Sequence, residues 1–376
     1  MAKILAVDDV EDNIFLLKMI LESHGHQVYT ALNGKEALEL AEENPVDLIL
    51  LDLMMPDMDG MEAASRLKNM EMTRHVPIIL LTAKKKEVQD VVEALQSGAD
   101  EYIAKPFNET ELMARVGSML RMKTLYDQVA NAHKMMEEDL STAQYVQKTL
   151  LPVKFPYPDK IKVCAHYEAT SSLGGDYYDV IDYGDGKVGA LVADVSGHGA
   201  SAALIMSMIK TIMISSIDGA ATPVKLAHLL NKRIIGMIPE ERYFTMFLAI
   251  ADLNERKLSY VRAGHPYPFL LRKQSKIVEK LDAEGDMIAM FGKITVKQSE
   301  IEINPGDRLV AYSDGLIEAV DFNDKMYGIN RLVKELESSF AMESNELLDH
   351  LVKSVNDFSG GRSNDDDVAL LIIEFI

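Results

Sequence analysis

The sequence is poor in cysteine, which limits how its fold is stabilised. Cys164 is the single cysteine among 376 residues. One cysteine excludes an internal disulfide framework and is typical of proteins of a reducing compartment. Cys164 lies in the apolar run 161–165. We therefore expect a buried structural thiol, with the fold stabilised by its core alone.

Long hydrophobic runs are also lacking. The apolar stretch 368–376 is too short to span a bilayer, and the stretch 202–214 is interrupted by Lys210. A secretory signal segment is not recognisable, because the strand-like pattern begins at Ile4. These features predict a cytoplasmic protein that does not enter the membrane.

Basic residues are scarce. Lysine and arginine total 39 against 59 acidic residues, a formal net charge of −20. Nucleic-acid binding requires a basic patch, so a nucleic-acid output domain is not expected. With 48% hydrophobic and 26% charged residues, the chain is typical of globular proteins, and its length suits two domains.

Aspartates placed beside glycines or at the edges of apolar runs are the most informative feature that is present. One such stretch would be an ordinary turn, because Asp and Gly are the commonest turn residues. Four of them in one half of the chain favour a site for two hard divalent cations, which bind carboxylate oxygens. The stretches contain Asp176, Asp194, Asp314 and the triplet Asp365–Asp367.

In their residues and in their order along the chain, these stretches resemble the motifs of the bacterial, SpoIIE- and RsbU-like branch of the metal-dependent protein phosphatases (the PPM family). The resemblance covers roughly the last two-thirds of the chain. It implies a sandwich of β-sheets flanked by helices, and hydrolysis of phosphoserine or phosphothreonine by water activated between two Mn²⁺ or Mg²⁺ ions. The ligands it implies are Asp176, Asp194 as the bridging residue, the backbone carbonyl of Val195, Asp314 and Asp366.

Three positions near these motifs are less clearly assigned. Asp366-Asp367-Val368-Ala369 fits the family's Asp-Asp-x-Thr pattern, although Ala369 stands where threonine is usual. His198 has the chemistry of an acid for the leaving serine oxygen, but it equally suits a loop histidine. His265 matches a family phrase that shapes a turn, and we interpret it as structural.

The first 120 residues alternate short apolar runs with amphipathic stretches, which predicts a doubly wound sheet of five parallel strands. In such sheets the functional crevice lies at the carboxyl ends of the strands. Polar residues follow four of the five expected strands. The expected strands are 4–7, 28–31, 48–53, 78–81 and 102–103, and the expected helices 14–21, 37–41, 61–67, 88–95 and 112–120.

This segment resembles the receiver domain of two-component response regulators. The resemblance makes Asp52 the phosphoacceptor, a carboxylate that forms an acyl phosphate. Its phosphodonor would be a sensor histidine kinase or a phosphotransfer protein. A cis peptide before Pro106 is also implied. One Mg²⁺ would be held by Asp9, Asp52 and the Met54 carbonyl, with Asp8 assisting; Lys105 would contact the phosphoryl oxygens, Thr82 would bind the phosphoryl group, and Tyr102 would be the aromatic switch.

A long helix is predicted between the two regions, from Thr110 to Leu150, because this stretch contains no proline and one glycine. Leu125, Val129, Ala132 and Met136 follow a heptad seam before the phase slips. The helix either packs on one of its own domains or forms a parallel homodimer.

The sequence thus predicts a receiver domain at 1–120, a helical coiled-coil linker at 121–152 and an α+β phosphatase domain at 153–376. In the phosphatase domain we expect mixed strands and helices, which indicates antiparallel sheets flanked by helices. The expected strands are 188–192, 245–251, 257–263, 269–272, 307–313 and 368–375, and the expected helices 201–216, 223–237, 328–339 and 343–358.

Three functions follow from these features. The first is a protein phosphatase controlled by receiver phosphorylation, acting on a phosphorylated anti-sigma antagonist with a STAS fold. The second is a phosphorylation-gated adaptor that binds a regulatory partner without catalysis. A cyclic-dinucleotide synthase is suggested by Gly174-Gly175-Asp176, but Tyr177 replaces its glutamate and the other aspartate motifs would be unexplained. The sequence leaves open whether receiver phosphorylation activates or inhibits.

Overall fold

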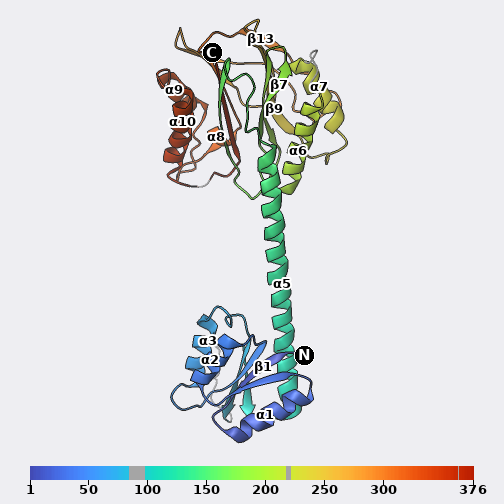
Figure 1. Ribbon diagram of the computed structural model, residues 1–376, viewed down its shortest axis with the longest axis vertical. Helices are drawn as coiled ribbons and strands as arrows, with labels where there is room; N and C mark the ends of the chain where they lie inside the picture. The colour runs from blue at the N-terminus through green and yellow to red at the C-terminus, as the bar shows by residue number, and fades with distance from the viewer. Residues whose placement is uncertain (84–97, 217–221, 363) are drawn as a thin grey trace. The chain divides into compact units, whose positions relative to one another are not determined.

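The computed structural model describes residues 1–83, 98–216, 222–362 and 364–376. The chain separates into two compact units, Met1–Glu137 and Glu138–Ile376. Helix α5 (Glu109–Leu150) begins in the first unit and ends in the second (Figure 1). Within the described ranges, none of the helices combines the length and apolar character needed to cross a membrane.

A parallel sheet of five strands forms the centre of the first unit, in the order β2-β1-β3-β4-β5. The doubly wound sheet predicted from the sequence is therefore confirmed. The predicted helix 88–95 lies outside the described residues. The strands are β1 (Lys3–Val7), β2 (Gln27–Ala31), β3 (Leu48–Asp52), β4 (Ile78–Ala83) and β5 (Glu101–Lys105).

Helices cover both faces of this sheet because its strands are apolar on both sides. On β1, Leu5 and Val7 pack with α2 and α3, whereas Ile4 and Ala6 pack with α1 and α5. Figure 1 shows α2 and α3 on one side of the sheet and α1 on the other. The helices are α1 (Glu11–Ser23), α2 (Gly34–Glu43) and α3 (Gly60–Asn69).

Two antiparallel five-stranded sheets pack face to face in the second unit, in the orders β13-β10-β9-β8-β7 and β12-β11-β14-β15-β6. Side chains of both sheets share one buried core. The strands are β6 (Ile161–Glu168), β7 (Tyr177–Gly184), β8 (Lys187–Val195), β9 (Phe244–Asp252), β10 (Lys257–Ala263), β11 (Phe269–Arg272), β12 (Ile277–Lys280), β13 (Ser299–Glu302), β14 (Arg308–Tyr312) and β15 (Val368–Phe375).

Helices cover the outer face of each of these sheets. Helices α6 and α7 pack on the sheet that contains β8, and α8, α9 and α10 pack on the sheet that contains β15 (Figure 1). This four-layer arrangement confirms the predicted α+β sandwich. The helices are α6 (Ala200–Ile214), α7 (Pro223–Ile234), α8 (Gly315–Glu318), α9 (Ile329–Ser338) and α10 (Ser344–Ser359).

Two predictions about smaller features are also confirmed. Cys164 is buried on β6, and its thiol donates a hydrogen bond to Asn345 Oδ1 at 2.7 Å. Helix α5 is continuous over 42 residues, as the absence of proline predicted. In the first unit its Tyr126 ring stacks on His75, with centroids 4.3 Å apart. In the second unit Leu150 packs against the core.

Candidate functional site

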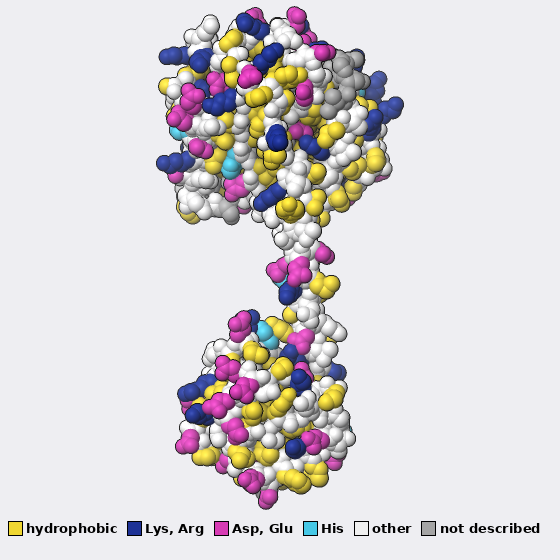
Figure 2. Space-filling view, in the orientation of Figure 1, with side chains coloured by type: hydrophobic (Ala, Val, Ile, Leu, Met, Phe, Trp, Pro, Cys, Tyr) yellow, Lys and Arg dark blue, Asp and Glu magenta, His cyan; other side chains and the backbone are white. Residues whose placement is uncertain are grey.

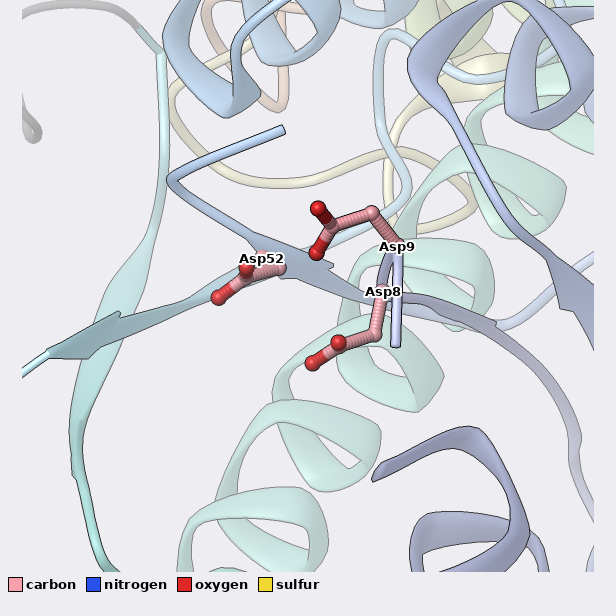
Figure 3. A group of neighbouring side chains, drawn as sticks. All are labelled: Asp8, Asp9 and Asp52. Atoms are coloured by element: carbon pink, nitrogen blue, oxygen red, sulfur yellow. The ribbon is translucent and has the colours of Figure 1, made fainter. Parts of the chain in front are cut away.

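Two groups of aspartates stand out, and the first lies at the carboxyl end of the parallel sheet. Asp8 and Asp9 follow β1, and Asp52 ends the neighbouring strand β3. One carboxylate oxygen from each residue lies within 4.8 Å of the others. Figure 3 shows the three side chains extending toward the same side. We call Asp8, Asp9 and Asp52 the first aspartate cluster.

A lysine compensates the charge of this cluster. Lys105 ends β5, and its Nζ donates hydrogen bonds of 2.6 Å to both Asp8 Oδ2 and Asp52 Oδ1. Burial raises the pKa of Asp52, and the hydrogen bond from Lys105 only partly offsets this effect. Burial alone would lower the pKa of Lys105, but its bonds to the two carboxylates raise it. Lys105 is therefore a fixed cation beside the predicted phosphoacceptor.

Backbone and amide groups hold the two buried aspartates in place. Asp8 Oδ1 accepts hydrogen bonds from the backbone N–H of Val10 and from Asn13 Nδ2. The loop after β3 folds back so closely that a Cβ at Gly60 would overlap the backbone carbonyl of Asp52. Glycine is therefore required where α3 begins. The expected cis peptide between Lys105 and Pro106 is present.

Of the other residues predicted for this site, Thr82 and Met54 lie at the same edge of the sheet, whereas Tyr102 lies near the start of β5, opposite Leu80. Thr82 lies near the end of β4, beside Ala104 of β5, and is half-buried. Tyr102 is half-buried on β5 and packs against the core under α2 and α3. Met54 lies in the loop after β3 with its side chain exposed.

The second aspartate cluster consists of Asp176, Asp194, Asp314 and Asp366. Asp176 precedes β7 and Asp194 lies near the end of β8, its partner strand. Asp314 follows β14, and Asp366 precedes β15, which pairs with β14. The four side chains therefore come from adjacent strand ends in two sheets that pack face to face. Their charges are close enough to shift one another's pKa values.

The pKa values of all four aspartates are raised, and burial is the largest cause in each case. Burial, followed by the charges of Asp314 and Asp366, raises the pKa of Asp194 to about 7. The same two causes, burial first and Asp366 next, raise the pKa of Asp314 to about 6. Asp176 is almost fully buried, and burial together with Asp194 raises its pKa well above the usual value. Partial desolvation raises the pKa of Asp366, and the charge of the neighbouring Asp367 adds to this effect, although part of the Asp366 side chain is exposed.

These properties fit divalent cations. Oxygen ligands are what Mg²⁺ and Mn²⁺ prefer, and a cation would relieve the repulsion between the carboxylates. Asp314 Oδ1 is buried without a hydrogen-bond partner, as expected of an oxygen intended for another ligand. Among the described residues, only the first cluster brings three acidic groups within 4.8 Å. A two-ion site spreads its ligands more widely, because its ions are about 3.5–4 Å apart.

The triplet Asp365–Asp367 divides into different roles. Asp367 is buried, and its carboxylate accepts hydrogen bonds from the backbone N–H and the hydroxyl of Thr170 and from the N–H of Gly175. Asp367 thereby fixes the loop before β7. Asp365 and Asp366 are exposed, and Asp365 pairs with Arg362 at 3.7 Å. The geometry therefore favours Asp366 as the ligand within the triplet.

Several residues of this site were not found by sequence reasoning. Ser313 Oγ donates a hydrogen bond of 2.5 Å to Asp176 Oδ2. On β7 the buried Asp179 binds Lys210 Nζ of α6 at 2.8 Å and accepts a bond from the Tyr177 hydroxyl. The lysine that interrupts the apolar run of α6 was a signal for this pair, since a charge in a buried stripe needs a partner.

The two histidines differ in environment. His198 is exposed in the loop after β8, close enough to Asp366 for its charge to lower that residue's pKa slightly. His265 is buried, and its Nδ1 lies 2.7 Å from Thr245 Oγ1. Burial lowers the pKa of His265 to about 3, so the ring is neutral at physiological pH. Val195, whose carbonyl was predicted as a ligand, is the buried last residue of β8.

Known proteins similar to the first unit are response regulators. Response regulator PleD of Caulobacter vibrioides is 41% identical over 128 residues, which are 34% of this chain and 28% of PleD. Transcriptional regulatory protein SrrA of Staphylococcus aureus is 49% identical over 119 residues, which are 32% of this chain and 48% of SrrA. The chain thus spans less than half the length of either relative. The response regulator receiver domain family matches residues 4–117.

The second unit is similar to phosphatase domains. The SiaA-PP2C domain of Pseudomonas aeruginosa superposes with a TM-score of 0.56 and 17% identity, covering 66% of this chain and all of that domain. At this identity the likeness shows the fold alone. The family described as stage II sporulation protein E (SpoIIE) matches residues 184–376, just over half of the chain. The chain therefore belongs to the SpoIIE family, with a PPM-type phosphatase domain that follows a response regulator receiver domain.

Proposed function

We propose that this protein is a response regulator in which phosphorylation of Asp52 controls a metal-dependent phosphoserine and phosphothreonine protein phosphatase. The observation that carries the proposal is the second aspartate cluster, which brings four carboxylates from two packed sheets together. Asp366 is among the charges that raise the pKa values of Asp194 and Asp314, and Asp194 raises that of Asp176. Carboxylates held together against their own repulsion are typical of a site that binds cations. Family membership supports the phosphatase chemistry.

The residues divide the chemistry between two sites. In the phosphatase site, Asp176, Asp194, Asp314, Asp366 and the Val195 carbonyl would hold two Mn²⁺ or Mg²⁺ ions, which lower the pKa of water and neutralise the phosphoryl oxygens. Ser313 orients the Asp176 carboxylate by its hydrogen bond. His198, which is exposed in the loop after β8 and near Asp366, would protonate the leaving oxygen.

In the receiver site the proposed nucleophile is the Asp52 carboxylate, which forms the acyl phosphate. Asp8 and Asp9, with the Met54 carbonyl, would hold one Mg²⁺. Lys105 Nζ already contacts Asp52 Oδ1 and would pair with the phosphoryl oxygens. Thr82 would bind the phosphoryl group from the end of β4, beside Ala104 of β5. Tyr102, near the start of β5, would be the aromatic switch that responds to Thr82.

Proposed partners follow from the two domain types. A sensor histidine kinase or phosphotransfer protein would phosphorylate the receiver. A phosphorylated anti-sigma antagonist with a STAS fold would be the substrate of the phosphatase domain, a proposal that rests on family resemblance. We place the receiver domain at 1–120, the linker at 121–152 and the phosphatase domain at 153–376.

We further propose that α5 mediates a parallel homodimer. The predicted seam residues Leu125, Val129 and Met136 expose 63%, 71% and 63% of their surface. Figure 2 shows hydrophobic side chains among charged ones on the surface of α5. Apolar residues at heptad spacing on one helix face favour a second copy of the same helix as partner. Sedimentation analysis of Val129→Glu against the wild type would test this, and an unchanged dimeric mass would reject it.

An adaptor without catalysis is the alternative function. It would not need the metal ligands, yet this chain retains an aspartate at all four positions. The repulsion among these aspartates favours the enzyme, because a binding domain gains nothing from carboxylates that destabilise one another.

The test is hydrolysis of p-nitrophenyl phosphate by the full-length protein with Mn²⁺ or Mg²⁺, and with EDTA. Each assay is run with and without beryllofluoride, which mimics the phosphorylated receiver. We expect metal-dependent turnover that changes with beryllofluoride, and Asp52→Asn should keep the turnover but lose the change. Absence of turnover in the folded protein under all conditions would reject the phosphatase in favour of the adaptor.

A further inference from the structure

Helix α5 ends in the second unit with a buried amide side chain. Gln147 is 5% exposed, although its neighbours Val146 and Lys148 are exposed. Its Nε2 donates a hydrogen bond of 2.6 Å to the backbone carbonyl of Gly174, and its Oε1 accepts one of 3.2 Å from the N–H of the same residue. One side chain of α5 therefore pairs both backbone polar groups of Gly174. Such a two-point contact fixes position and orientation together.

Gly174 is confined on its other side. A Cβ at this position would overlap the hydroxyl of Tyr167 and would lie 2.8 Å from Asp367 Oδ2. The close approach explains why a glycine is needed here, since its φ angle is not in the left-handed region. The backbone at Gly174 is therefore held between Gln147 and the β6 and β15 side of the sandwich.

The next residue carries this constraint to the metal ligands. The N–H of Gly175 donates to Asp367 Oδ2 at 2.6 Å, and a Cβ on Gly175 would lie 2.8 Å from the carbonyl oxygen of Val195. Asp176 follows directly in the chain. The loop that Gln147 holds thus contacts one predicted ligand, the Val195 carbonyl, and continues into another, the Asp176 carboxylate.

We propose that Gln147 is a positioning residue of the phosphatase metal site. Its amide fixes Gly174, and through the Gly174-Gly175 loop it sets the places of the Asp176 carboxylate and the Val195 carbonyl. This inference rests on the proposed function for its chemical meaning. Because Gln147 belongs to the linker helix, rotation of the last turns of α5 moves the amide away from Gly174. The last turns of the linker helix therefore help to hold the loop that carries the proposed metal ligand Asp176.

A simpler role for Gln147 would be that of a polar anchor for the end of α5. Three variants separate the two roles. Gln147→Leu keeps a similar size and removes both bonds to Gly174 together with the 3.4 Å bond from Nε2 to Met206 Sδ. Gln147→Asn keeps the amide but is one methylene too short to reach. Gln144→Leu, the matched control, makes the first substitution at a half-buried glutamine one turn earlier on α5.

The first readout is the Mn²⁺ concentration that gives half-maximal hydrolysis of p-nitrophenyl phosphate by the full-length protein. We expect it to rise about tenfold in Gln147→Leu and in Gln147→Asn, the scale seen when groups that orient metal ligands are removed. Excess Mn²⁺ should restore turnover, with KM for the ester within roughly twofold of wild type. Gln144→Leu should behave as wild type.

The second readout is hydrogen–deuterium exchange of the metal-free proteins, which does not require activity. Gln147→Leu should speed exchange in peptides that cover 170–178, while peptides of β15 stay as in the wild type. Unchanged exchange at 170–178 would overturn the proposal. Faster exchange throughout the unit, with turnover that excess Mn²⁺ does not restore, would also overturn it and make Gln147 a fold anchor only. A wild type without Mn²⁺-dependent turnover contradicts the proposed function instead, and the exchange comparison still decides the place of Gln147.

Discussion

The two aspartate clusters of this chain solve the same electrostatic problem differently. In the receiver, Lys105 lies 2.6 Å from two carboxylates and compensates their charge within the protein. In the phosphatase domain, the groups that act on Asp194 are further carboxylates, and its pKa rises to about 7. In the proposed function Asp52 must stay available as a nucleophile, and a cation within the protein suits this role. In the proposed metal site, bound cations would instead balance the negative charge of the aspartates.

The largest expected effect tests whether the second cluster depends on cations. Asp366→Asn removes a proposed ligand, whereas Asp365→Asn changes its exposed neighbour. We expect Asp366→Asn to lower Mn²⁺-dependent hydrolysis of p-nitrophenyl phosphate by about 10³-fold, on the scale of several kcal/mol of transition-state stabilisation. Asp365→Asn should remain near wild type. The reverse order of the two variants would move the ligand to Asp365.

A second test uses Asp179, a carboxylate of the phosphatase domain whose charge is balanced by a lysine within the protein. Asp179 is buried and paired with Lys210, much as Asp52 is paired with Lys105. Lys210→Met leaves this carboxylate without its partner and should lower the free energy of unfolding by about 2–4 kcal/mol. Denaturant unfolding at pH 7 measures the loss. The double variant Lys210→Met/Asp179→Asn should recover part of it, and no recovery would contradict the pairing.

Lys105→Met would leave the first aspartate cluster without its lysine, so that its carboxylates repel one another without a cation, as in the second cluster. Without the lysine, the pKa of Asp52 should rise further, because burial and the charges of Asp8 and Asp9 already raise it. We expect the receiver to lose about 1–3 kcal/mol of stability at pH 8 and less at pH 5, because a carboxyl with a raised pKa takes up a proton more readily as the pH falls. Urea unfolding at the two pH values checks this. Equal losses at both would show that Lys105 acts through packing alone.

The smallest effect concerns the metal-free phosphatase domain. The pKa of Asp194 is about 7 in the folded protein and 3.8 for the free side chain, so the folded state binds more protons between these values. Stability in EDTA should therefore fall as pH rises from about 4 to 7, by about 1–2 kcal/mol from this residue. Calorimetry of the full-length protein should show a flatter pH dependence in Asp194→Asn. An equal slope in both proteins would place the repulsion elsewhere.

Much of the fold was predictable because its signals are local. Short apolar runs such as Ile4–Val7, interleaved with amphipathic stretches and followed by polar residues, predicted the receiver sheet. The strands β10, β11 and β15 were predicted with their observed bounds. β7 was missed because Tyr177 to Asp179 carries polar groups on a strand buried on both faces, where alternation is lost.

The supporting residues of the phosphatase site were not predictable for a different reason. The bond from Ser313 to Asp176 joins positions 137 residues apart, and the bonds from Gln147 to Gly174 join positions 27 apart. A serine or a glutamine in a single sequence carries no sign of such a partner. Likewise, Asp366 and Asp367 have the same chemistry, and the sequence assigned Asp366 through the family pattern alone. The physical reason lies in the hydrogen bonds that Asp367 accepts from Thr170 and Gly175.

The position of β15 also has a consequence for synthesis of the protein. β15 is inserted between β14 and β6, and Asp366 and Asp367 immediately precede it. During translation the receiver emerges first and can fold while the rest is being made. Until β15 has left the ribosome, the loop before β7 lacks the hydrogen bonds to Asp367, and the second cluster lacks Asp366. A nascent chain can thus acquire its receiver domain well before the second aspartate cluster is complete, so the proposed activity would belong to finished copies alone.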